Sequence, residues 1–150
     1  IPMKFRTLLV ASLLVIVWQS VACAADRKIY VSDAWIREAP PNAVSLAGYM
    51  AMENQSGEEL SLVSAAADVF AHVMIHQTTH EGGMARMHHQ DQVPIPPRAT
   101  IRFEPNGYHL MLMHPQQAIK SGDRVTIHLG FSDGNEQPVI FEVRKQAPVK

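Results

Sequence analysis

The sequence predicts an all-β protein, a β-sandwich or small Greek-key barrel of seven to nine strands. From residue 26 onward, apolar and polar residues alternate in short runs that turn-forming residues separate. No stretch of ten or more residues has the spacing of an amphipathic helix. The chain of 150 residues, with 47% hydrophobic and 18% charged content, is typical of one globular domain.

The expected strands follow one another with turn formers between them. Pro40-Pro41-Asn42 ends the first strand, Asn54-Gln55-Ser56-Gly57 ends the second, and Glu81-Gly82-Gly83 joins two strands in a hairpin. The prolines between Pro94 and Pro97 mark an edge or crossing loop, because proline cannot donate to a sheet ladder. The expected strands cover residues 29–37, 45–53, 60–65, 73–79, 84–89, 100–103, 107–113, 125–131 and 139–144.

The N-terminal segment has the pattern of a secretory signal. Two basic residues precede an apolar run over residues 8–18, and Ala22-Cys23-Ala24 offers the small residues that a signal peptidase accepts. The apolar run is short for a membrane span. We therefore predict a cleaved signal peptide over residues 1–24 and a secreted, periplasmic domain over residues 25–150, which does not insert into the membrane.

Cysteine content and charge limit the possible functions. The only cysteine is Cys23; its lipid modification, which would anchor the domain, is the alternative to cleavage after Ala24. After that cleavage the chain has no thiol, which excludes disulfides, zinc–thiolate sites and thiol catalysis. Eleven basic residues then face fourteen acidic ones, a net charge of −3, so no nucleic-acid partner is expected. No catalytic motif stands out, and we expect a protein that is not an enzyme.

Histidine and methionine are concentrated in the middle of the chain. All eight histidines lie between His72 and His128, and alternation over residues 107–113 places His109, Met111 and Met113 on one strand face. A ligand late in one strand and another after the Gly-Gly turn can face each other across a hairpin, while a later strand adds two more. The spacing H-x10-M-x21-H-x-M is formed by His76, Met87, His109 and Met111.

This donor set indicates a soft metal ion. Thioether sulfur is soft and uncharged, and imidazole binds metals in its neutral form, so two histidines and two methionines favour Cu(I) over hard ions and over zinc. A blue-copper electron carrier would need a cysteine thiolate, which the secreted part lacks. The composition therefore predicts a protein that carries copper.

The contribution of the neighbouring side chains is open at this stage. Met113 is expected to shield the site, and His72 and Met74 share the face of His76, either as auxiliary donors or as a solvated strand edge. His89 shares the face of Met87 and is treated as a surface residue. Met84 falls on the opposite face and is expected to pack in the core or the turn.

The spaced motif, with its flanks Gly82 to Met87 and Gly107 to Met113, resembles the periplasmic copper chaperone family PCuAC. The resemblance covers residues 29–141. It implies a cupredoxin-like β-sandwich that binds one Cu(I) through His76, Met87, His109 and Met111. It also implies delivery to a cuproenzyme, the copper site of cytochrome c oxidase subunit II or a Sco-type thiol protein. We expect the protein to act as a monomer. A copper buffer or resistance protein without a dedicated acceptor is the alternative.

Overall fold

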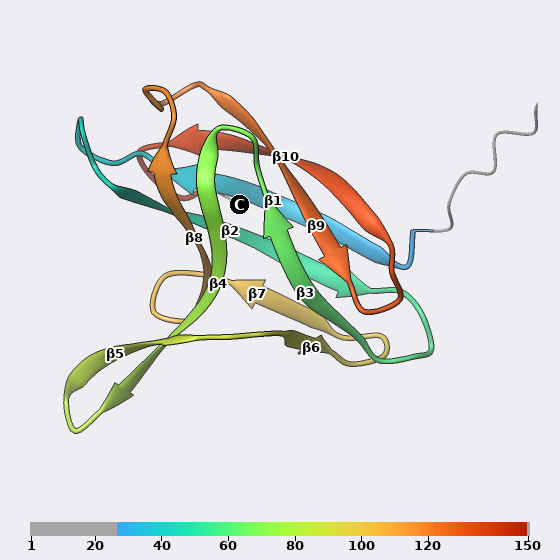
Figure 1. Ribbon diagram of the computed structural model, residues 1–150. Helices are drawn as coiled ribbons and strands as arrows, with labels where there is room; N and C mark the ends of the chain where they lie inside the picture. The colour runs from blue at the N-terminus through green and yellow to red at the C-terminus, as the bar shows by residue number, and fades with distance from the viewer. Residues whose placement is uncertain (1–26, 150) are drawn as a thin grey trace, which may run out of the picture.

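The computed structural model describes residues 27–149, which form ten strands and no helix (Figure 1). The predicted signal peptide and Cys23 lie outside this range. Over the same range, no helix is long and apolar enough to cross a bilayer. The strands are β1 (Ile29–Arg37), β2 (Ser45–Asn54), β3 (Leu60–Ala66), β4 (Phe70–Glu81), β5 (Met84–His89), β6 (Val93–Ile95), β7 (Thr100–Phe103), β8 (Tyr108–Pro115), β9 (Arg124–Phe131) and β10 (Glu136–Arg144).

The all-β prediction is confirmed, and nine of the ten strands coincide with expected ones. The exception is β6, which lies in the proline-rich segment that was expected to be an edge or crossing loop. Val93 and Ile95 of β6 are buried, while Pro94 between them points outward. Since β6 is the last strand in the sheet order, the missing N–H of Pro94 costs no ladder bond, and the expectation of an edge was right.

All ten strands belong to one sheet, which curves around a single core. The order is β5-β4-β8-β7-β2-β1-β10-β9-β3-β6, with an additional pairing of β8 with β2. Strands distant in sequence are neighbours: β1 pairs parallel with β10, and β3 pairs antiparallel with β9. This connectivity is that of a Greek-key sandwich, in which long connections return strands beside distant partners.

The core lies on one face of β4 and β8, and this determines where the histidines and methionines go. Ile75 of β4 and Leu110 and Leu112 of β8 are buried in the common apolar cluster. Because side chains alternate along a strand, the residues between these core positions occupy the other face. That outer face carries most of the donors predicted to bind metal.

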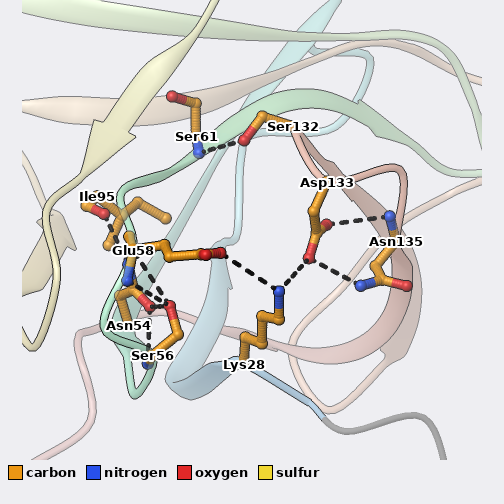
Figure 2. A network of polar contacts seen from close by, with 9 residues as sticks. All are labelled: Lys28, Asn54, Ser56, Glu58, Ser61, Ile95, Ser132, Asp133 and Asn135. Carbon is orange, nitrogen blue, oxygen red and sulfur yellow. Dashed lines mark hydrogen bonds and ion pairs between the residues drawn. The ribbon is translucent and has the colours of Figure 1, made fainter.

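A buried asparagine connects strands that the ladder does not join. Asn54, which is fully buried, donates from Nδ2 to the carbonyls of Glu58 and Ile95 at 2.7 and 2.9 Å, and its Oδ1 accepts from the Ser56 hydroxyl at 2.7 Å (Figure 2). It thereby joins the end of β2 to the following turn and to β6. Nearby, Lys28 lies 3.8 Å from a Glu58 oxygen and 3.9 Å from an Asp133 oxygen (Figure 2).

The hairpin of β4 and β5 projects beyond the other strands, at the lower left of Figure 1. Its turn consists of Gly82 and Gly83, both at positive φ (58° and 81°), between the paired residues Glu81 and Met84. Two successive positive φ angles are what a tight type I′ hairpin turn requires, and glycine adopts them without steric cost. Every residue of β5 is exposed, so this strand forms an open arm.

Candidate metal centre

Three neighbouring strands place histidines side by side, with β4 between β5 and β8. In the register, His76 of β4 is opposite His89 of β5 on one side and opposite His109 of β8 on the other. The ring centres of His76 and His109 are 5.9 Å apart, and those of His76 and His89 are 5.6 Å apart. His76 is therefore the middle of a row of three imidazoles.

His109 is held in one orientation by its own strand. The side chain is buried, with 7% exposed, and its Nδ1 lies 3.2 Å from the carbonyl oxygen of Gly107. A carbonyl can only accept, so this contact places the proton of the neutral ring on Nδ1. The lone pair is then on Nε2. A backbone carbonyl that fixes the tautomer in this way is the usual support of a metal-binding histidine.

His76 has a nitrogen that no other group uses. Its Nδ1 is buried and has no hydrogen-bond partner among the described residues. Burial lowers the pKa of His76 below its usual 6.5, and the neighbouring His109 and His89 lower this pKa further. Metal ions bind the neutral ring, so these surroundings favour the form that is ready to act as a ligand.

Met111 lies next to His109 on the same face of β8. It is half-buried and is opposite Met74 of β4 and Ala47 of β2. Ala47 contributes only a methyl group on the β2 side. His109 and Met111 therefore present an imidazole and a sulfur from alternate positions of one strand.

Met87 is the most remote of the four predicted ligands. It is opposite Thr78, on the hairpin side of His76, whereas Met111 is opposite Met74 on the other side. On a flat sheet this offset separates the two methionines by about 13 Å along the strands and about 10 Å across them. Both sulfurs reach one ion only if the β5 arm curls over the face. The side chain of Met87 is 56% exposed, and every residue of β5 is exposed, so little core packing holds the arm in its extended position.

The remaining histidines and methionines divide between the two faces. His72 and Met113 are opposite each other on the face of the predicted site, two residues beyond Met74 and Met111. Met84 lies at the base of the turn, and its side chain is 61% exposed, so the expectation that it packs in the core or turn is wrong. The outward position of a residue beside a projecting two-residue turn explains this. His88 lies on the other face and contacts the Thr79 hydroxyl at 3.1 Å.

The donors suit a soft ion better than a hard one. Among residues 27–149, no three His, Cys, Asp or Glu side chains are gathered as a ready-made metal site. An ion on this face must therefore use thioethers together with imidazoles, which is the donor set of Cu(I). A surface cleft of about 970 Å³ lies elsewhere, between the β1–β2 loop and residues 114–120. The site is thus a shallow face without a deep pocket.

Comparisons with known proteins agree with this architecture. The family model of LpqE-like lipoproteins matches residues 29–143. A Leifsonia xyli subsp. xyli protein named as a lipoprotein, Lxx21020, is 26% identical over 117 residues, which cover 77% of this chain and 69% of the relative.

Two solved structures share the fold. Cu(I)-bound DR1885 from Deinococcus radiodurans is 32% identical with a TM-score of 0.66, and the match covers 86% of each chain. The copper-bound PCuAC domain of PmoF2 is 21% identical with the same TM-score, covering 81% of this chain and 94% of the domain. The predicted cupredoxin-like fold and the resemblance to PCuAC domains are confirmed. This chain belongs to the LpqE-like family, whose fold is that of the PCuAC copper-binding domains.

Proposed function

We propose that this protein is a copper carrier that binds one Cu(I) through His76, Met87, His109 and Met111 and passes it to another protein. The observation that carries the proposal is the face on which the ring centres of His76 and His109 lie 5.9 Å apart. Met111 lies beside His109 on the same face. Two imidazoles that share one ion have ring centres about 5–6 Å apart, since each nitrogen lies about 2 Å from the metal. The relative DR1885, which is 32% identical, has been solved with Cu(I) bound.

The chemistry of the face suits transfer. Its donors are neutral, so Cu(I) is held without an anionic ligand, and a cysteine-containing acceptor binds the ion more tightly. Because the ion would lie on a shallow surface, an acceptor thiolate can approach it while one or two of the original ligands remain attached. Such a ligand exchange needs no redox step. Met87, on the exposed β5 arm, would be the first ligand to leave.

We propose that the protein acts in the periplasm after removal of its leader, and that its acceptor is cytochrome c oxidase subunit II or a Sco-type thiol protein. The leader-like pattern over residues 1–24 and the PCuAC resemblance support this assignment. The lipoprotein names of the family model and of Lxx21020 also support export, and they keep a lipid anchor on Cys23 as the second possibility. A binding protein without catalytic activity fits these features.

The binding test removes both predicted thioether ligands, Met87 of β5 and Met111 of β8, and compares the result with a substitution of Met84. In an anaerobic titration against a Cu(I) chelator, the wild type is expected to take up one equivalent of Cu(I). The double variant Met87→Ala/Met111→Ala is expected to lose this tight equivalent. Met84→Ala is the matched control, because Met84 is equally exposed but lies on the other face. Full-strength binding by the double variant would disprove the site.

A transfer assay separates a chaperone from a copper buffer. The Cu(I)-loaded protein is mixed with a purified oxidase copper domain, and the copper content of each partner is measured after separation. Transfer faster than the release of Cu(I) to buffer supports a chaperone, since it requires contact between the proteins. Transfer limited by that release identifies a buffer instead.

A further inference from the structure

We propose that Met74 is a further Cu(I) ligand on this face, which completes the site with His76, His109 and Met111 while the β5 arm is extended. Met87 replaces Met74 when the arm closes over the face. This inference rests on the proposed copper function and deepens it, because it names the donor that holds the ion whenever Met87 is away. Met74 is outside the spaced motif of two histidines and two methionines.

The register of β4 with β8 brings Met74 to the predicted ligands. Met74 is directly opposite Met111, and His76 is directly opposite His109. Ile75, between Met74 and His76, is buried in the core, so both of its neighbours lie on the outer face of β4. The four donors therefore form a two-by-two block on adjacent strands.

The dimensions of this block suit one ion. Residues directly opposite each other have Cβ atoms about 5 Å apart, and residues two apart along a strand are separated by about 7 Å. An ion above the middle of the block thus lies about 4 Å, measured along the sheet, from each of the four backbone positions. Imidazole and the unbranched thioether side chain can both span such a distance. The ring centres of His76 and His109, 5.9 Å apart, already have the spacing of imidazoles that share one ion.

Met87 is much farther from this block while the hairpin is extended. It is opposite Thr78, on the hairpin side of His76, so its sulfur reaches the ion only after β5 curls over the face. Met74 needs no such movement, because it belongs to β4 and is half-buried in place, as Met111 is. The strand β5 ends at His89, opposite His76, and so stops short of Met74.

The exchange of Met87 for Met74 would keep the ion four-coordinate during transfer. One Cu–S bond forms as another breaks, and no electron or proton moves, because a thioether is neutral and binds without deprotonation. Two sulfurs and two imidazoles are present before and after the exchange, so the ion keeps the donor set that Cu(I) prefers. An acceptor that displaces Met87 therefore meets an ion that β4 and β8 still hold.

The test counts the sulfur ligands in leucine variants. Leucine keeps the apolar volume of methionine and removes its sulfur, so the variants should remain folded. Cu K-edge X-ray absorption is recorded on the anaerobic Cu(I) complexes of the wild type, Met74→Leu, Met87→Leu and the double variant Met74→Leu/Met87→Leu. Each single variant is expected to keep two sulfur and two imidazole ligands, since either methionine can join Met111.

The double variant Met74→Leu/Met87→Leu is expected to keep one sulfur. In the chelator titration it should bind Cu(I) at least about tenfold more weakly than either single variant, which is the smallest loss typical of removing even an outer-shell partner of a metal. The matched control is Met87→Leu/Met113→Leu, because Met113 is also half-buried on the outer face but lies one step outside the block. This control should keep two sulfurs.

The outcomes keep this inference separate from the proposed function. A single sulfur in the Met87→Leu complex, or equal Cu(I) affinity of Met87→Leu and the Met74→Leu/Met87→Leu variant, would overturn the role of Met74 while leaving Cu(I) carriage intact. Absence of Cu(I) uptake by the wild type would instead overturn the proposed function.

Discussion

At the scale of single residues, the most unusual group is the imidazole of His76. Its Nδ1 is buried and unpartnered among the described residues, in a protein where Asn54 satisfies its polar atoms with several bonds. A buried nitrogen without a partner destabilises the fold unless it gains one. The arrangement therefore favours a state in which something binds to His76, and a metal ion is the ligand that the neighbouring rings suit.

The lowered pKa of His76 predicts a pH dependence of the metal-free protein. Below about pH 6.5 the ring becomes protonated in the unfolded chain while it stays neutral in the folded one. The unfolded state then binds more protons, so the free energy of unfolding should fall as the pH is lowered from about 7 to 5. Urea denaturation across this range is the measurement, and His76→Gln should flatten the curve. An NMR titration that places the His76 pKa at or above 6.5 would contradict the argument.

Alternation along the sequence predicted which motif residues share a strand face, and the expectation that His89 is a surface residue agrees with its exposure. Alternation along residues 107–113 was enough to place His109 and Met111 on one face. The pairing of His89 with His76 follows from the turn. A two-residue turn at Gly82-Gly83 fixes the pairing of its hairpin, so counting back from Glu81 and Met84 sets His76 opposite His89.

At the scale of elements, the turn residues predicted the hairpin of β4 and β5. They could not predict that β8 pairs with β4 on its other side. The ends of β5 were correct because the turn before it is short and glycine-rich. The pairing of β4 with β8 joins segments separated by a long connection, and no turn rule sets that register. Only the spacing of the motif could therefore predict that His76 and His109 lie close together. The burial of β6 was missed because three residues are too few for alternation to show.

Asn54 predicts how strongly β6 depends on one side chain. Asn54→Ala removes the donors to the carbonyls of Glu58 and Ile95, which leaves a buried carbonyl of β6 without this bond (Figure 2). The expected loss is about 2 kcal/mol in the free energy of unfolding. Chemical denaturation measures it. Asn135→Ala is the control, because Asn135 bonds Asp133 on the surface and should cost less than about 0.5 kcal/mol. An equal loss of unfolding free energy in both variants would contradict a stabilising role for the buried hydrogen bonds of Asn54.

At the scale of the whole molecule, one curved sheet separates stability from binding. The inner face of β4 and β8 contributes Ile75, Leu110 and Leu112 to the core, while the outer face carries the donors. Substitutions of outer residues should therefore change copper affinity with little effect on folding. The fold class could be predicted from the sequence because apolar and polar residues alternate as the strands turn one face to the core and the other to solvent. The order of the strands could not, because it depends on contacts between distant segments.

Metal loading should nevertheless stabilise the whole molecule, because an ion that binds only the folded state shifts the unfolding equilibrium. At a free Cu(I) concentration 100 times Kd, the gain is about 2.7 kcal/mol. For a domain of this size this corresponds to a rise in Tm on the order of 10 °C. Anaerobic calorimetry with and without Cu(I) measures the shift, and a chelator should reverse it. A Met87→Ala/Met111→Ala variant whose Tm rises as much as that of the wild type would contradict the assigned ligands.

The exposure of Met87 on the β5 arm has a chemical consequence. The thioether that the proposed acceptor protein would reach is equally open to peroxide, which converts methionine to its sulfoxide. The sulfoxide is polar and offers a hard oxygen in place of the soft sulfur. Buried Met50 and Met52 are protected from the same reaction by the core. Oxidation of Met87 would therefore lower the affinity of the protein for Cu(I) while the protein remains folded. Continued copper binding would then depend on methionine sulfoxide reductases that restore Met87.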